Sequence, residues 1–398
     1  MTTTAERMRA WQGPALLSFG FRPFFLGAGL WACLAMLLWI PMLSGRIVLP
    51  TALDPVSWHA HEFLFGYLMA AVAGFLLTAV PNWTGRLPIV GWPLGGLFAV
   101  WILGRVAIAT SLHWPAWAVA LADLGFPVLL GLALAREITA GRNWRNLVVL
   151  GALAVLTLGN AIFHWEAAQG DYAAGGAGLR LGLAAGLMMI AIIGGRIVPS
   201  FTRNWLVRHG GGRLPAPASA FDRAVLIVTA LAFAGWAAVP DWPVAAVGLI
   251  LAGVLNAVRL ARWCGHRTGG EPLLWVLHAG YAFLPLGALA VGAEVLSPGV
   301  LGMAGAQHLW MAGAIGVMTL AVMTRATLGH TGHPLTAGSG TTLLFVSIVA
   351  ATLLRVGAGA VPAHAPLLHT ASGLAWLGAF GGFVLLYGPL LLRPRGER

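Results

Sequence analysis

The chain has no lysine and few charged residues of any kind. All 23 of its basic residues are arginine, and charged residues make up only 9% of its 398 residues. A soluble globular protein carries about 25% charged residues, which cover the surface that faces water. Because 59% of this chain is apolar, its composition argues against a soluble enzyme, a nucleic-acid-binding protein and a disordered protein.

Cysteine is nearly absent as well. Cys33 and Cys264 are the two cysteines, and they fall in different apolar segments. They form neither a disulfide framework nor a paired-cysteine metal motif. If the chain binds a metal, we therefore expect imidazole ligands.

The sequence is rich in long apolar runs. Their length, about 20 residues, is enough to cross a bilayer as a helix. The runs are continuous and do not alternate, which favours helices over a β-barrel. The sequence predicts an all-α polytopic membrane protein with one integral membrane domain over 1–398. The twelve expected spans lie near 21–43, 58–80, 89–110, 115–135, 146–165, 178–198, 222–239, 242–262, 272–293, 301–325, 341–359 and 367–391.

The placement of arginine predicts the orientation of these spans. With both termini in the cytoplasm, 19 of the 23 arginines fall on the cytoplasmic side, as the positive-inside rule requires. We attribute the net charge of +11 to this topology, so we expect membrane lipid and no nucleic acid as a partner. The cytoplasmic set is Arg7, Arg9, Arg22, Arg86, Arg136, Arg142, Arg145, Arg196, Arg203, Arg208, Arg213, Arg223, Arg259, Arg262, Arg267, Arg325, Arg393, Arg395 and Arg398, whereas Arg46, Arg180 and Arg355 lie outside and Arg105 lies within a span.

Three span ends indicate an internal repeat. The V-P-x-aromatic-T pattern at Val80 recurs at Val198, an offset of 118. The third span end, His330-Thr331-Gly332-His333, matches Trp83-Thr84-Gly85-Arg86 at an offset of 247. The same offset relates His61 to His308 and Gly66 to Gly313. These offsets predict three repeats of four helices over about 20–140, 141–265 and 266–398. Chance matching in helices rich in glycine and alanine is the alternative. A true repeat would place membrane sites at the repeat interface.

Ionisable side chains within the predicted spans are the candidate functional residues, because they are costly in lipid and usually mark a site. Four helices are expected to bring histidine to one layer near the outer face. The residues are His59, His61 and Glu62 in the second span, Asn160 and His164 in the fifth, His308 in the tenth and His369 in the twelfth. Arg105 and Asp123, in the third and fourth spans, are expected to form a buried ion pair.

Several histidines at one depth suggest that imidazole binds haem iron or copper. His59 and His61 are two positions apart, so on a regular helix they face opposite ways and serve different centres; an unwound turn would let them share one. Glu62 is placed to accept a hydrogen bond from a ligating imidazole, and Arg105 to pair with a haem propionate. The alternative for each histidine is an interhelical hydrogen bond.

Six sequence blocks resemble the NnrS family, and they cover most of the chain. They are Gly20-Phe21-Arg22-Pro23-Phe24-Phe25, Trp58-His59-Ala60-His61-Glu62, Ala79-Val80-Pro81-Asn82-Trp83-Thr84-Gly85-Arg86, the run from Gly195 to Trp205, Leu277-His278-Ala279-Gly280-Tyr281, and the run from Gly313 to Gly332. The resemblance implies a twelve-span protein of the bacterial inner membrane that contains haem b and copper and belongs to the nitric-oxide response. A weaker resemblance to haem-copper oxidases places axial histidines at His61 and His308, but the sixth and seventh spans lack histidine, which argues against an oxidase-type copper site.

These observations lead to two hypotheses for function. In the first, the chain binds and detoxifies nitric oxide, with His61 and His308 as axial ligands. His59, His164 and His369 are then the candidate ligands of a second metal, and Glu62 is the candidate catalytic residue. Such a protein could act as a nitric oxide reductase-like oxidoreductase that takes electrons from a donor. In the second, the chain is a transporter or carrier of haem, copper or nitrosylated iron complexes in nitrosative-stress defence.

Overall fold

The computed structural model describes residues 11–86 and 88–394 and, within them, is helical without a strand. It contains twelve helices long and apolar enough to cross a membrane, and each overlaps one of the predicted spans. The all-helical, twelve-span prediction is therefore confirmed. Four arginines assigned to the cytoplasmic side, Arg7, Arg9, Arg395 and Arg398, lie outside the described residues.

The chain divides into two compact units. Unit 1 consists of 1–182, 326–333 and 383–398, and unit 2 of 183–325 and 334–382. The boundary between the units falls inside three helices: α8 (Ala177–Met189), α14 (Met318–Thr331) and α16 (Ala365–Leu392). The predicted single domain and the three repeat units stay predictions.

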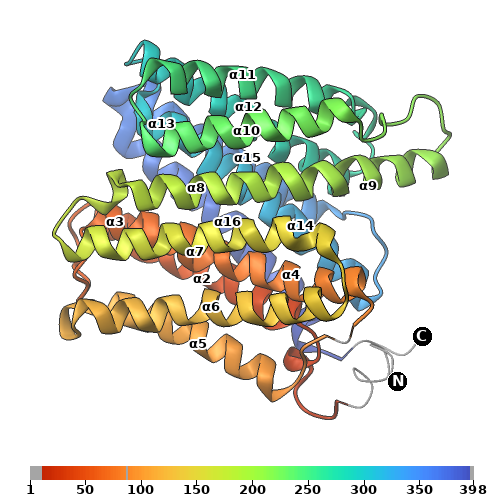
Figure 1. Ribbon diagram of the computed structural model, residues 1–398, viewed down its shortest axis with the longest axis horizontal. Coiled ribbons are helices and arrows are strands. Elements are labelled where there is room, and N and C mark those ends of the chain that lie inside the picture. The colour runs from red at the N-terminus through yellow and green to blue at the C-terminus, as the bar shows by residue number, and fades with distance from the viewer. Residues whose placement is uncertain (1–10, 87, 395–398) are drawn as a thin grey trace. The chain divides into compact units, whose positions relative to one another are not determined.

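Unit 1 is built mainly from the first five spans. Its helices are α2 (Phe21–Leu43), α3 (Pro55–His61), the π-helical segment η2 (Glu62–Tyr67), α4 (Leu68–Thr84), α5 (Trp92–Ala109), α6 (Ala116–Ala140) and α7 (Leu147–Ala168). Figure 1 shows α5, α6 and α7 running side by side, and α6 also packs against α4. Aromatic rings fill the space between α2, α5 and α6, where Phe24 stacks on Phe126 and meets Phe98 edge to face.

The second span begins and ends at residues that cap helices well. The Asp54 carboxylate accepts hydrogen bonds from the backbone N–H groups of Val56 and Ser57, at 2.9 and 3.0 Å, and Pro55 occupies the first helical position. Gly85 ends α4 in the left-handed conformation with φ of 69°. In the most apolar stretch of this span 78% of the residues are buried, against 33% in α6. The second span is therefore an inner helix, and polar side chains on it must find partners within the protein.

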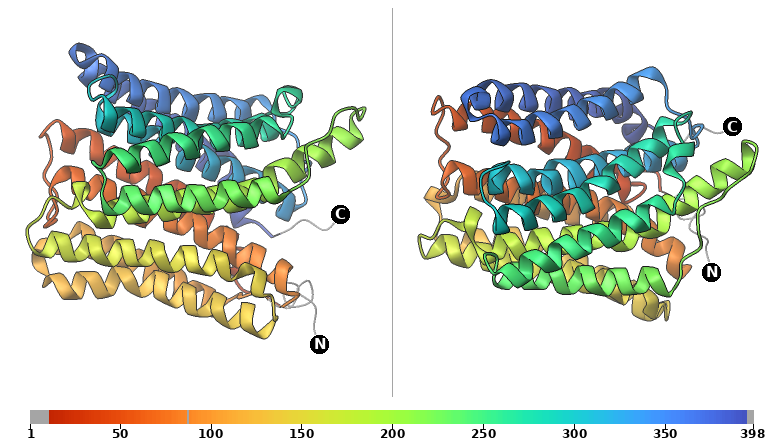
Figure 2. Two further views of the ribbon diagram at one scale, coloured as in Figure 1. Left: turned by 45° about the horizontal axis from the view of Figure 1, so that its top comes forward. Right: turned by 90° about the horizontal axis from the view of Figure 1, so that it is seen from above.

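Unit 2 is arranged around one buried helix, α12 (Pro272–Leu296), which packs against most of its neighbours. Figure 2 shows α10 and α11 running alongside each other. The other helices are the π-helical segment η6 (Ile190–Gly194), α9 (Gly195–Arg208), α10 (Ala220–Ala238), α11 (Pro243–Ala261), α13 (Gly302–His308), the π-helical segment η8 (Leu309–Val317) and α15 (Ser339–Ala360). Trp310 of η8 donates a hydrogen bond from Nε1 to the Leu284 carbonyl of α12, at 2.9 Å.

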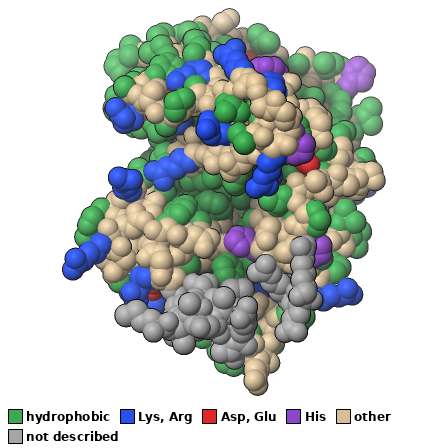
Figure 3. Space-filling model, turned by 90° about the vertical axis from the view of Figure 1, so that its right-hand side faces the viewer, with side chains coloured by type: hydrophobic (Ala, Val, Ile, Leu, Met, Phe, Trp, Pro, Cys, Tyr) green, Lys and Arg blue, Asp and Glu red, His purple; other side chains and the backbone are tan. Residues whose placement is uncertain are grey.

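Several of the arginines predicted to lie on the cytoplasmic side also bind other residues of the protein. In unit 1, buried Arg22 donates from Nη1 to the Leu391 carbonyl near the C-terminal end of α16, at 2.9 Å. In unit 2, buried Arg259 binds the Asp222 carboxylate and the Tyr281 hydroxyl. Other arginine side chains are exposed on the face drawn in Figure 3, where they outnumber acidic ones. The positive-inside count therefore includes residues that also hold helices together.

Candidate metal centre

The polar side chains of unit 1 meet in one buried cluster formed by five elements. The cluster consists of His61 at the end of α3, Glu62 at the start of η2, Arg105 of α5, Asp123 of α6, and Asn160 and His164 of α7. All except His164 are at most 3% exposed, and the His164 side chain is 11% exposed. Buried ionisable groups are unfavourable unless they are paired, so the contacts within the cluster decide what it can do.

The two carboxylates share Arg105. Arg105 Nη1 donates to both oxygens of Glu62, at 2.8 and 2.7 Å. Arg105 Nη2 contacts Asp123 Oδ1. The predicted buried ion pair of Arg105 and Asp123 is therefore confirmed, and Glu62 completes it. This arrangement leaves the second oxygen of Asp123, Oδ2, facing the histidines.

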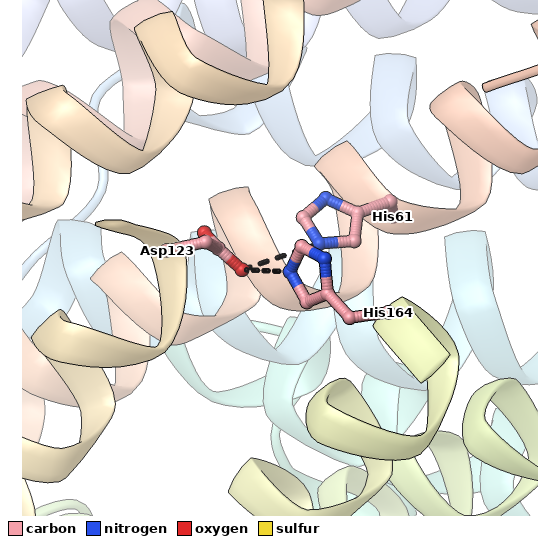
Figure 4. Close-up of side chains that lie close together, drawn as sticks. All are labelled: His61, Asp123 and His164. Carbon is pink, nitrogen blue, oxygen red and sulfur yellow. Dashed lines mark hydrogen bonds and ion pairs between the residues drawn. The ribbon is translucent and has the colours of Figure 1, made fainter. Parts of the chain in front are cut away.

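Asp123 Oδ2 is the centre of the cluster, as Figure 4 shows. His164 Nε2 lies 3.1 Å from it and His61 Nε2 lies 3.3 Å from it. Asn160 Nδ2 donates to the same oxygen at 2.7 Å, and Asn160 Oδ1 lies 3.1 Å from His61 Nε2. One ligand atom each of His61, Asp123 and His164 lie within 4.8 Å of one another, a spacing that can hold a metal ion.

Glu62 contacts the other nitrogen of His61. The distance from His61 Nδ1 to Glu62 Oε1 is 3.0 Å. A carboxylate at this nitrogen holds the Nδ1–H tautomer and turns Nε2 toward Asp123, as metal-bound histidines generally require. This is the position expected for Glu62 from the sequence, next to a candidate ligand imidazole.

Glycine makes this close packing possible. A Cβ atom on Gly66, in η2, would lie 2.5 Å from Arg105 Nη1 and 2.9 Å from Glu62 Oε2. A Cβ atom on Gly104 would lie 2.9 Å from Asp123 Oδ1. Any larger side chain at these two positions must displace the groups that hold the cluster together. Directly after His61, the helix changes from α-helical to π-helical hydrogen bonding in η2. Such π-helical turns are frequent at functional sites.

His59 lies outside the cluster, in an aromatic environment. Its ring stacks on Trp39 at a centroid distance of 4.2 Å and meets Phe63 at 4.6 Å. His59 and His61 therefore face different surroundings, as expected for two residues of a helix that stays regular through His61.

The other predicted ligands, His308 and His369, belong to unit 2, as does His278 from one of the sequence blocks that resemble the family. His308 ends α13, and its Nδ1 lies 2.6 Å from the Ala304 carbonyl of its own helix. His369 lies in α16 and is partly buried. His278, on α12, is buried, with Nε2 2.9 Å from Thr202 Oγ1. The predicted roles of His59, His308 and His369 as ligands stay predictions.

The packing around His61 does not fit an axial haem ligand. Both ring nitrogens face polar side chains, and the ring packs against Phe65, Phe163 and His164 at centroid distances of 5.3–5.4 Å. A porphyrin over Nε2 would have to replace Asp123 and Asn160. A single ion requires no such displacement, because Asp123 Oδ2 already lies beside both Nε2 atoms.

From the sequence, Asp123 is expected only as an ion-pair partner, and Asn160 lies in the candidate layer without a role. An acid in the middle of an otherwise apolar helix was one available signal. The other was the spacing of Asn160 and His164, which at four positions lie on one helix face. The packing of α6 and α7 brings Asp123, Asn160 and His164 next to His61. No pattern in the local sequence predicts that packing.

Comparison of the chain with curated proteins finds no match. The family model described as NnrS protein matches residues 15–395, almost the whole chain. The matched region includes every residue of the cluster and all twelve membrane-spanning helices. The chain therefore belongs to the NnrS family.

Proposed function

We propose that this NnrS-family protein binds nitric oxide at a metal centre held by His61, Asp123 and His164, and so removes it from the membrane. The observation that carries the proposal is the convergence of these three side chains on one point inside a membrane-spanning helical unit. The family resemblance supports nitric oxide as the ligand. Nitric oxide is neutral and apolar, so it partitions into the bilayer, where this cluster lies.

A redox-active ion at this position would supply the orbitals that bind nitric oxide. The side chains supply the rest. Glu62 orients His61, and Arg105 offsets the charge of both carboxylates. Phe65 and Phe163 pack on the His61 ring and keep that side of the cluster apolar. A charged ligand is therefore disfavoured relative to a neutral diatomic gas.

Reduction of nitric oxide is an extension of this proposal. It needs electrons from a donor and protons delivered to the cluster. His164 is partly exposed and lies in contact with Asp123, which contacts His61, which contacts Glu62. With the ion bound, His164 Nε2, Asp123 Oδ2 and His61 Nε2 would be its ligands, so the contact of this series that stays available for proton transfer is the one between His61 Nδ1 and Glu62. In the proposal Glu62 holds the proton, which matches the catalytic role predicted for it.

The proposal also includes haem b and copper, bound at positions other than the cluster. Since His61 does not fit an axial ligand, haem would be bound by His59, His308 or His369. A separate copper centre would draw on the same histidines. The proposed setting is the bacterial inner membrane, with both termini in the cytoplasm.

A carrier of haem, copper or nitrosylated iron is the second candidate. It is favoured by the π-helical segments η2, η6 and η8, which interrupt the second, sixth and tenth spans. π-helical turns are frequent at functional sites, and in a carrier they would be the points where a helix changes shape.

Anaerobic purified protein and a nitric oxide electrode separate these roles. We expect a stoichiometric loss of dissolved nitric oxide without reductant. Continued consumption with reductant indicates reduction, and consumption that stops at one equivalent indicates scavenging. A flat electrode trace under both conditions contradicts the proposal and favours the carrier.

A further inference from the structure

We propose that His61, Asp123 and His164 form a mononuclear non-haem iron(II) site. The ligands are His61 Nε2, His164 Nε2 and Asp123 Oδ2. The choice of a redox-active ion rests on the proposed function, because zinc, which offers the same coordination, has no redox chemistry with nitric oxide.

The donor set favours iron(II) over copper(I). Two imidazole nitrogens and one carboxylate oxygen, with positions left open, are typical of non-haem iron(II) centres. Copper(I) prefers thiolate and thioether sulfur. The six side chains of the cluster contain no sulfur: they are two histidines, two acids, an arginine and an asparagine.

The distances already match shared coordination. Two atoms bonded to one ion at about 2.1 Å and in neighbouring positions are about 3.0–3.4 Å apart. Asp123 Oδ2 lies 3.1 Å from His164 Nε2 and 3.3 Å from His61 Nε2. Two of the three pairs of ligand atoms therefore lie at distances that fit a shared ion, and all three atoms lie within 4.8 Å of one another.

The neighbouring side chains fix how each ligand can bind. Glu62 at His61 Nδ1 leaves Nε2 as the ligand atom. Arg105 engages Asp123 Oδ1, so Asp123 is restricted to one oxygen, Oδ2. Three protein atoms then surround the ion, which leaves coordination positions for a water molecule or a diatomic gas. The Asn160 amide lies beside these positions, 2.7 Å from Asp123 Oδ2, and can donate a hydrogen bond to such a ligand.

The charges of the buried cluster also call for a cation. Glu62 and Asp123 carry two negative charges against the one positive charge of Arg105. With neutral imidazoles the cluster retains a net negative charge in a buried environment, where an unbalanced charge is unfavourable. A bound cation supplies positive charge beside the two carboxylates, as protonation of one histidine would also do.

The test is metal analysis of the full chain, purified without oxygen from cells supplied with iron, copper and zinc. Haem is assayed separately, so that non-haem iron is measured directly. We expect about one non-haem iron per chain and, with nitric oxide, a half-integer-spin paramagnetic resonance signal. Asp123→Asn and His164→Ala should each lose at least about tenfold of this iron.

Asp222→Asn is the matched control, because Asp222 is also an acid paired with a buried arginine, Arg259, but lies in unit 2. It should keep the iron of the unaltered chain. Helix content measured by circular dichroism shows that each variant is folded.

The outcomes separate the two proposals. Copper in place of iron, lost in the same two variants, overturns the iron assignment and leaves the metal centre of the proposed function. Zinc in place of iron overturns the iron assignment and also the binding of nitric oxide at this centre, because zinc has no redox chemistry with nitric oxide. Iron at the site with no response to nitric oxide overturns the proposed function and leaves the iron site. Absence of metal from the folded, unaltered chain overturns both.

Discussion

At the scale of single residues, the proposed metal site depends on side chains that would not themselves contact the ion. Glu62 orients His61 and is bound by Arg105 through both its oxygens. Arg105 in turn engages Asp123. Substitution of either supporting residue should therefore change metal binding or stability even though the three ligands remain.

Glu62→Gln tests the orienting role. Glutamine keeps the shape but loses the charge that holds Nδ1–H of His61, so we expect metal affinity to fall about 10–100-fold. Competition with a chelator of known affinity measures this change. Glu137→Gln, at the end of α6 with Arg86 as partner, should leave the affinity unchanged; equal affinities in all three proteins would contradict an orienting role.

Arg105→Met tests the charge balance. Removing one partner of a buried ion pair leaves an uncompensated charge and typically destabilises a protein by about 3–5 kcal/mol. We expect a loss of that order in the free energy of unfolding in detergent. Arg136→Met removes an arginine whose side chain is 68% exposed, and it should change stability by less than about 1 kcal/mol. Similar losses in the two variants would show that Arg105 is not a buried partner.

The sequence predicted some of these contacts and not others. Burial of charge in an apolar helix was enough to pair Arg105 with Asp123, because neither side chain can remain alone in lipid. The joining of His61, Asp123 and His164 depends on the rotation and depth of three separate helices. Neither quantity leaves a pattern in the local sequence.

At the scale of elements, the positions of helix breaks carry information beyond hydropathy. α3 and α13 both have seven residues, each ends in histidine, and a π-helical segment follows each. Their first residues, Pro55 and Gly302, are separated by 247, the same offset that relates His61 to His308. This agreement supports the predicted repeat, which stays a prediction. Hydropathy located all twelve spans, although the sixth was predicted to end near 198 and its helix continues to Arg208. Hydropathy gave no indication of the π-helical segments, because they alter hydrogen bonding and not composition.

Gly66→Ala tests the close packing of η2 against α5. The added Cβ would meet Arg105 Nη1 and Glu62 Oε2 closer than real Cβ atoms approach other atoms. We expect a lower melting temperature together with a reduced metal content. Gly96→Ala is the control, because a Cβ on Gly96 of α5 has no other atom within 4 Å, and alanine in a helix should stabilise by up to about 1 kcal/mol. Unchanged stability and metal content in Gly66→Ala would contradict the packing.

At the scale of the whole molecule, the arginine distribution predicts which ends of the helices face the cytoplasm. Single cysteines in place of exposed Gln169, after α7, and exposed Arg208, at the end of α9, test this orientation. A thiol reagent that cannot cross membranes should label Gln169→Cys in intact cells and Arg208→Cys only after lysis. The unaltered chain, with Cys33 partly buried and Cys264 buried, measures the background, and the reverse labelling pattern would contradict the orientation.

The central claim is that nitric oxide binds to a metal held by His61, Asp123 and His164. Infrared difference spectroscopy of the purified chain, loaded in turn with ordinary and isotopically labelled nitric oxide, tests it most directly. We predict a nitric oxide stretching band that shifts with the isotope, is lost in Asp123→Asn and is retained in Asp222→Asn. A band that survives unchanged in Asp123→Asn would contradict the claim, because the ligand would then be bound elsewhere.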